Sequence, residues 1–508
     1  MAYAIEQSGR KPVDVVDVAY NIRLAPSTIR RQRAGERARW QTLTSAALLA
    51  AYFLWFAWDG LHARWANDDV MNIYSAWKPG PWNLITSLVA LWRGFNRPLG
   101  GVFYSTVYHF FGLDPLPYRI VVLLLLGLNV WLAYRFARAL GCDELTSALM
   151  ATVVSFHANL GSLHYNTDVV YDILCFTFYA AAFVYYTGIR ARGRLLRGGE
   201  IAVFFGLFLG ALDSKEMAVT LPLTLLAYEA LYHRPSGWSW KELRTWIAGP
   251  GSMVLWAAGM NLVYLYGKKY GPDPLMRMPA YQPVLSWSRF LNFQQGNMAD
   301  LLFLDHIGPY GLLVLYAATG ILAWRFARPV LSFCWMFVWI APLPVEFLEG
   351  RRQSVMYIPL LGWATYAAVV LVAVIRALAQ FLATLPGGRR LGARVLAVAM
   401  LALVLVPWVR MNRKIQTEYL HPAMLDQGRL TWPIIQQFAA MKPKVPPHST
   451  VAILNDPFQD YDMVFIASLA LGDRTVNIHL QRKSQLPESD LAKMPQFTWE
   501  NGKLLRLR

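Results

Sequence analysis

The chain has 508 residues, of which 56% are hydrophobic and only 16% are charged. Because a soluble protein of this length needs more charge to cover its surface, the composition excludes an ordinary soluble protein and indicates a polytopic α-helical membrane protein. The formal net charge is +17, but the arginines fall mainly in short clusters between apolar runs. This pattern is typical of cytoplasmic loops and argues against a nucleic-acid partner.

Residues 1–40 are polar and rich in arginine, so we expect them to form a basic segment on the cytoplasmic side. The first apolar run starts after them and lacks a small-residue cleavage site, so no cleavable signal peptide is predicted. The three cysteines, Cys142, Cys175 and Cys334, lie in or beside apolar segments without CxxC spacing. Neither a disulfide framework nor a zinc site is therefore expected.

Eleven apolar segments are then predicted to cross the membrane as helices. They cover residues 41–58, 118–139, 146–161, 170–188, 199–213, 217–232, 245–266, 311–327, 329–345, 355–376 and 391–410. The predicted membrane module spans residues 41–410, with external loops at 59–117 and 268–310. Because the N-terminus is predicted to be cytoplasmic, an odd number of crossings predicts that the C-terminus lies on the outer side of the inner (plasma) membrane.

Residues 98–112 (PLGGVFYSTVYHFFG) are apolar but short for a crossing of ~20 residues. If they crossed, the basic loop at 190–197 would lie outside. If they lie at the surface, every later basic cluster falls in the cytoplasm. Charge bias favours the second arrangement but does not decide it.

Residues 411–508 are more polar than the preceding region. VAIL (451–454) and TVNIHL (475–480) read as strands, and DYDMVFIASLALG between them reads as a helix. This pattern predicts a small extracytoplasmic α/β domain.

With this topology, the unusual polar residues gather on the outer face, where ionisable groups at membrane depth are usually kept for function or for pairing. They are Asp68, Asp69, Arg97, His157, His164, Asp168, Asp172, Asp213, Lys215, Glu216, Lys268, Lys269, Glu346, Glu349, Arg351, Arg352 and Tyr357. Carboxylates act as general bases or metal ligands, while arginine and lysine bind phosphate. The combination indicates group transfer from a lipid-linked phosphate donor.

The stretch WANDDVMNIYSAW (65–77) resembles the acidic pair in the first external loop of the GT-C superfamily of membrane glycosyltransferases. NRPLGGVFYSTVYHFFGLDPLPYR (96–119) is similar to the segment that follows it in protein O-mannosyltransferases. Ser214-Lys215-Glu216, Thr220-Leu221-Pro222 and Gly350-Arg351 with Tyr357 and Pro359 look like later motifs of the TMTC-type enzymes. The resemblance covers roughly residues 41–365.

The resemblance implies an inverting transferase that moves a sugar from a polyprenyl-phosphate donor to an extracytoplasmic glycan, lipid or protein acceptor. The residue roles expected from it, together with the charge pattern, are the following. Asp68 is the general base, and Asp69, also catalytic, orients it or binds the acceptor or metal; Asp168, His164 and Glu216 lie on the acceptor or metal side; Arg351, Arg352, Lys215, Lys268 and Lys269 hold the donor phosphate; Arg97 and Tyr357 give support. A Mg²⁺ or Mn²⁺ cofactor stays open, because no spacing defines a ligand set.

Two departures from the TMTC pattern leave the sugar and the acceptor open. No 34-residue repeat follows the membrane region, and the turn at HYNTD (164–168) lacks a family-style arginine. An O-antigen-type glycan polymerase or ligase would use similar lipid-linked chemistry, although the acidic pair argues against it. A lipid-linked sugar flippase or transporter is disfavoured, because no internal repeat is present and the charges gather at the outer boundary.

Overall fold

The computed structural model describes residues 42–91, 97–233, 239–272, 274–326, 328–384 and 390–508. The predicted cytoplasmic segment at 1–40 lies outside these residues, as does part of the basic stretch 387–394. The chain divides into two units, residues 1–51 and residues 52–508. In the first unit, residues 42–51 are helical, and all contacts described below belong to the second.

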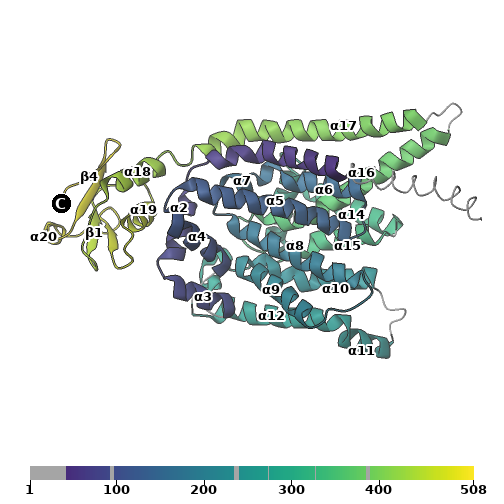
Figure 1. Ribbon diagram of the computed structural model, residues 1–508, viewed down its shortest axis with the longest axis horizontal. Coiled ribbons are helices and arrows are strands. Elements are labelled where there is room, and N and C mark those ends of the chain that lie inside the picture. The colour runs from purple at the N-terminus through teal and green to yellow at the C-terminus, as the bar shows by residue number, and fades with distance from the viewer. Residues whose placement is uncertain (1–41, 92–96, 234–238, 273, 327, 385–389) are drawn as a thin grey trace, which may run out of the picture. The chain divides into compact units, whose positions relative to one another are not determined.

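Each segment predicted to cross the membrane contains a helix (Figure 1). Besides the helical residues 42–57, these are α5 (Pro115–Ala139), α6 (Glu144–Ser155), α8 (Val170–Arg190), α9 (Gly199–Ser214), α10 (Leu221–Tyr232), α12 (Pro250–Tyr270), α14 (Pro309–Phe326), α15 (Pro329–Ile340), α16 (Tyr357–Thr384) and α17 (Arg390–Ile415). The shorter helices outside them are α2 (Asn67–Trp77), α3 (Pro81–Val89), α4 (Pro98–Phe111), α7 (Ser162–Tyr165), α11 (Trp240–Ala248) and α13 (Trp287–Leu301).

Four helical stretches among the described residues are long and apolar enough to cross a membrane by length and composition. They are Pro115–Ala139, Val170–Arg190, Gln353–Leu382 and Val395–Leu425. The chain therefore carries spans of the kind expected of a multi-pass membrane protein. That the shorter helices also cross, to give eleven spans, stays a prediction.

Local sequence signals set where the long helices begin. Asp114 caps α5 by accepting a hydrogen bond from the Leu116 N–H at 3.1 Å, and a proline occupies the first turn. Asp143 caps α6 in the same way, accepting from the Thr146 N–H at 2.9 Å. Caps of this kind satisfy backbone donors that have no partner within the helix.

Helix α4 contains most of the short apolar segment 98–112, for which the sequence left open whether it crosses the membrane. It lies across the start of α8. The Tyr104 hydroxyl, in the middle of α4, donates to the Thr167 carbonyl at 2.6 Å. Before α4, the Arg97 guanidinium lies over the Tyr171 ring; just after α4, the Leu113 carbonyl accepts from the Trp65 indole at 2.7 Å. Figure 1 shows α2, α3 and α4 together at one end of α5 and α8. Both ends of α4 therefore contact residues near the starts of α5 and α8; that residues 98–112 lie at the membrane surface stays a prediction.

The ion pairs agree with the predicted alternation of the turns. Arg97 pairs with Glu216 and Lys215 pairs with Asp172, all in predicted outer turns. Arg190 pairs with Glu229, both at the predicted inner ends of their helices. Within the described ranges, no ion pair joins a predicted inner turn to a predicted outer one. Which face meets the cytoplasm stays a prediction.

The C-terminal region contains a four-stranded sheet in the order β2-β1-β3-β4. Its elements are β1 (Thr450–Ile453), α19 (Asp462–Leu471), β2 (Asn477–Leu480), α20 (Glu488–Leu491), β3 (Gln496–Glu500) and β4 (Lys503–Arg506), preceded by α18 (Thr431–Met441). Strands β1 and β2 run parallel with α19 between them in the chain, in the predicted order. The predicted boundary at residue 411 falls inside α17, which continues as the π-helical segment η7 (Gln416–Leu425).

Candidate active site

Asp69, in the first turn of α2, is the best-anchored carboxylate among the residues predicted to face outward. It is 0% exposed. One carboxylate oxygen, Oδ1, accepts from the Thr167 N–H at 2.9 Å, the Thr167 hydroxyl at 2.7 Å and the Asp168 N–H at 2.7 Å. The other, Oδ2, accepts from the Ala66 N–H and the Arg119 guanidinium, each at 3.0 Å.

A carboxylate offers about four lone-pair sites, so the five donors around Asp69 leave no room for a substrate proton. Asp69 instead ties the first external loop to the turn before α8 and to the start of α5. The sequence grouped Asp69 with Asp68 as catalytic; its surroundings suit the orienting part of that role.

Asp68, the adjacent residue, is exposed. Within the part of the chain that the structure describes, its carboxylate has no hydrogen-bond or ion-pair partner. Partial loss of water around the carboxyl group, and then the charge of Asp69, raise the pKa of Asp68. Of the two acids, Asp68 is therefore the one available to take a proton from a substrate.

Asp168 provides a second carboxyl group beside the pair. Its backbone is held by Asp69, while its own Oδ1 is buried without a hydrogen-bond partner among the described residues. Burial, and then the charges of Asp69 and Asp68, raise the pKa of Asp168 to about 7. A carboxyl group that titrates near neutral pH is suited to proton transfer.

The pKa of Asp168 predicts a pH dependence of stability. The folded state raises this pKa from 3.8 to about 7, so it binds the proton more tightly than the unfolded chain does. The resulting stabilisation is complete below about pH 4 and is lost as the pH rises through about 7. We expect Asp168→Asn to flatten this part of the curve of thermal midpoint against pH. An unchanged slope in the variant would contradict the assignment.

Two outer-face residues with expected substrate roles, Glu216 and Lys215, are already paired. Burial alone would raise the pKa of Glu216, but the Arg97 guanidinium, at 2.8 Å, outweighs it and lowers the pKa to about 2. The Lys215 ammonium donates to both oxygens of Asp172 at 2.6 Å. These pairs brace the turn before α10 against α4 and α8, and Lys215 has less capacity left for a phosphate than the sequence suggested.

Tyr281, in the short 3-10 helix η5 (Pro279–Tyr281), connects the first-loop region to the later arginines. The Arg97 guanidinium lies 5.6 Å from the centre of its ring, and the Arg351 guanidinium lies 4.4 Å from it. Arg97 also lies 5.3 Å from the ring of Tyr171, three residues after Asp168. A continuous path of contacts thus joins the acidic residues to Arg351.

Arg351 and Arg352 line a polar groove with a volume of about 440 Å³. The groove also contains Arg289, Ser286, Ser288 and Asn292 from the start of α13. Arg352 pairs with Asp300 at 2.9 Å, and Arg289 pairs with the exposed Glu349 at 3.2 Å. Because Arg352 and Arg289 are each paired with a carboxylate, Arg351, which has no ion-pair partner among the described residues, is the guanidinium group of this groove most available to an anion such as a phosphate.

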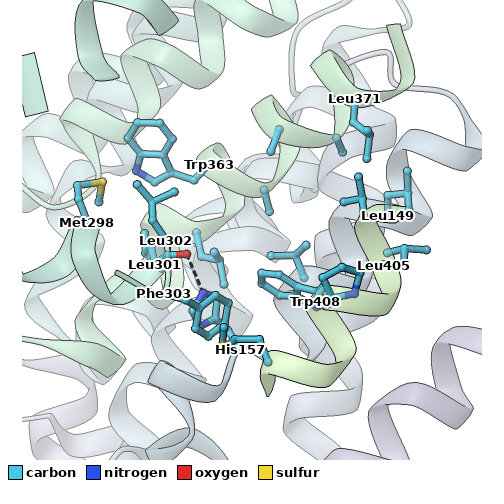
Figure 2. A pocket seen from close by; sticks show the side chains of 18 of the residues that line it. Leu149, His157, Met298, Leu301, Leu302, Phe303, Trp363, Leu371, Leu405 and Trp408 are labelled. Carbon is cyan, nitrogen blue, oxygen red and sulfur yellow. Dashed lines mark hydrogen bonds between the residues drawn. The ribbon is translucent and has the colours of Figure 1, made fainter. Parts of the chain in front are cut away.

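An apolar cavity of about 480 Å³ lies beside the other half of α13 (Figure 2). Met298, Leu301 and Leu302 line it from this side, facing residues of α6, α16 and α17. His157 lies at its edge, where its Nε2 bonds the Leu301 carbonyl at 3.1 Å and its ring stacks on Phe303. The two cavities therefore share one helix, with polar lining near its start and apolar lining near its end.

The remaining predicted residues are less directly placed. His164 is buried against Phe156, with its Nε2 3.1 Å from the Ser155 carbonyl, and so belongs to the apolar packing under the loop. Lys268 is buried against Tyr264, and Lys269 lies over Tyr270. Tyr357 stacks on Phe176, as a supporting residue would.

Sequence reasoning missed Arg119, Thr167, Tyr281 and Arg289. Arg119 could have been suspected, because it is an arginine at the start of a long apolar helix. Nothing in the local sequence distinguishes the other three. In the described ranges, no group of three or more His, Cys, Asp or Glu side chains is arranged to hold a metal ion.

No family model and no curated protein matches the chain. Among solved structures, it is similar to ArnT from Cupriavidus metallidurans in the apo state, with 14% identity and a TM-score of 0.44 over 89% of this chain and 92% of that one. It is also similar to the same protein bound to undecaprenyl phosphate, with 15% identity and a TM-score of 0.43 over 85% of each chain. At these values, neither similarity assigns an activity to this chain.

Proposed function

We propose that this protein is a membrane glycosyltransferase of the GT-C superfamily. It transfers a sugar from a polyprenyl-phosphate donor to an acceptor at the outer face of the membrane. The observation that carries the proposal is the run of contacts from Tyr171, three residues after Asp168, through Arg97 and Tyr281 to Arg351 in the arginine groove. Each half of the reaction has its own group of residues along this path.

On the acceptor side, Asp68 acts as the general base. It removes the proton from the acceptor hydroxyl as the oxygen attacks the anomeric carbon of the sugar and the bond to the donor phosphate breaks. Asp69 holds the loop, since its own lone pairs are occupied. Asp168, with a pKa of about 7, lies where it can bind the acceptor or relay the proton.

On the donor side, α13 matches an amphipathic ligand. The groove beside its start carries Arg289, Arg351 and Arg352, while the cavity beside its end is almost entirely apolar. From Asn292 to Leu301 the helix rises about 14 Å, a short distance between an anionic head group and the start of a hydrocarbon chain. We assign the leaving phosphate to the groove and the polyprenyl chain to the apolar cavity.

The rim of the groove suits a place where lipid meets water. Leu285 is 81% exposed and Trp287 is 71% exposed, and they alternate with the groove residues Ser286 and Ser288. Exposed apolar side chains next to a polar groove are typical of segments at a membrane interface. A donor held in the bilayer could then present its phosphate from the side.

The function is tested by identifying the lipid-linked sugar. Mass spectrometry of membrane lipids should show one polyprenyl-phosphate monosaccharide accumulating when the protein is removed, and purified protein in nanodiscs should consume it. Accumulation of an oligosaccharide on a diphospholipid would indicate a polymerase or ligase instead. Transport of the lipid-linked sugar across proteoliposomes without transfer would indicate a flippase.

Arg351→Ala and Arg352→Ala should each weaken donor binding. A hydrogen bond to a charged group contributes about 1.5–3 kcal/mol, so the KM for the donor should rise roughly 10- to 100-fold. The control is Arg277→Ala, an exposed arginine outside the groove. A donor KM unchanged in both groove variants would move the phosphate site elsewhere.

A further inference from the structure

The C-terminal sheet region packs directly on α2, the helix that carries Asp68. The Phe465 ring, in α19, lies 5.1 Å from the ring of Tyr74. The Tyr108 hydroxyl, in α4, donates to the Leu469 carbonyl at 2.7 Å. The region thus contacts α2, which carries Asp68, and α4, whose Ser105 hydroxyl donates to the Ala76 carbonyl of α2 at 3.2 Å.

Arg474 and Lys78 make the polar part of this contact in a reciprocal arrangement. The Arg474 Nε donates to the Trp77 carbonyl at 2.8 Å, and its guanidinium lies 5.3 Å from the centre of the Trp77 ring. In return, the Lys78 ammonium donates to the carbonyls of Arg474 at 2.8 Å and Val476 at 3.2 Å. Each side chain therefore holds the backbone of the other segment.

We propose that Arg474 is a positioning residue for the transferase reaction, acting through α2 on Asp68. The inference rests on the proposed function for its effect on transfer, but the docking itself does not. Asp69 fixes the first turn of α2, and Arg474 with Lys78 fixes its last residue and the one after it. A helix held at both ends has a defined direction and rotation, and this sets where the Asp68 carboxylate points.

The length of α2 between Asp68 and the Arg474 contact favours this role. Asp68 and Trp77 are nine residues apart, which corresponds to about 14 Å along a helix. Because Asp69 holds the first turn of α2, tilting the far end turns the adjacent Asp68 side chain about this anchor, relative to the turn before α8. A displacement of about 1 Å can cost about 100-fold in rate when it misplaces a reacting group.

The start of α19 also lies near Asp68. Burial, followed by the charges of Asp460 and Asp68, raises the pKa of Asp462 in the first turn of α19. The acidic start of α19 thus lies close enough to Asp68 for the two charges to interact. Undocking should move these acidic groups away from Asp68 and lower its pKa.

Hydrogen exchange on the full-length protein in nanodiscs tests the docking without a substrate. In Arg474→Ala and in Lys78→Ala/Arg474→Ala, we expect the amides of α2 to exchange at least ~10-fold faster, with β1 and β3 still protected. Arg474→Lys keeps a cation near Trp77 and should restore part of the protection. Arg506→Ala is the matched control, because among the described residues this exposed arginine donates to the Arg508 and Lys444 carbonyls, both within the same region.

A transfer assay then tests the effect on Asp68. The Arg474 variants should lower kcat about 10- to 100-fold with little change in the KM for the donor, and the acid limb of the pH profile should move to lower pH. Unchanged α2 exchange with a folded sheet would overturn the docking role. Faster exchange with normal kcat and pH profile would overturn the catalytic part, and wild-type protein without any transfer would refute the proposed function alone.

Discussion

Asp68→Asn is expected to abolish sugar transfer while the protein still folds. A positioned general base contributes about 100- to 10,000-fold to the rate, and an amide cannot accept the acceptor proton at neutral pH. Because Asp68 is exposed and unpaired within the described residues, its replacement removes no stabilising contact. Single-turnover transfer with the lipid-linked donor, together with the thermal midpoint, measures both parts.

The matched control is Asp305→Asn, which changes an exposed aspartate in the loop between α13 and α14. It should transfer at the wild-type rate. Asp168→Asn separates the two candidate bases, because it should slow the reaction less than Asp68→Asn. Wild-type turnover by Asp68→Asn would show that Asp68 is not the general base and would favour Asp168 in that role.

The second large effect is expected on stability, from Arg119→Ala. The guanidinium donates to Asp69 at 3.0 Å, and the two side chains are only 1% and 0% exposed. Removing one partner of a buried ion pair leaves an uncompensated charge and typically costs about 3–5 kcal/mol. We therefore expect a clear drop in the thermal midpoint and in the yield of folded protein, with transfer lost as the first loop detaches.

The control for this variant is Arg194→Ala. Its pair with Glu200 is shorter, at 2.6 Å, but the side chains are 31% and 29% exposed. Such a pair contributes about 0–1 kcal/mol, so the midpoint should hardly move. Equal losses in the two variants would show that burial does not decide the contribution of the Arg119–Asp69 pair.

The helical architecture could be predicted because its signals are local. Apolar runs of membrane length, with basic clusters between them, predict helices wherever they occur, and each of the eleven predicted segments contains one. The β-α-β pattern near the C-terminus is equally local, since alternation and turn residues act over a few positions. Whether residues 98–112 cross the membrane depends instead on where the two ends of α4 lie, which local signals do not show.

The candidate site could be predicted only in part. Sequence alone named the acidic pair, Arg97, Asp168 and the Arg351–Arg352 pair, because ionisable residues are conspicuous beside apolar segments. It could not find Tyr281 or Arg289, since an aromatic or basic residue in a long polar loop is ordinary. Nor could it show that Lys215 and Glu216 are each paired with an opposite charge.

The sequence by itself determined a helical membrane protein with acids and cations in its predicted outer turns, because hydropathy and charge act through near neighbours. Only the tertiary structure distinguished the surroundings of Asp68 from those of Asp69, although the two side chains are identical and adjacent in the sequence. Asp69 is buried by partners 50 and 98 residues away, Arg119 and Thr167, while Arg474 reaches the end of the same helix from 397 residues away. Burial and pairing are decided by such distant residues, which no local pattern contains.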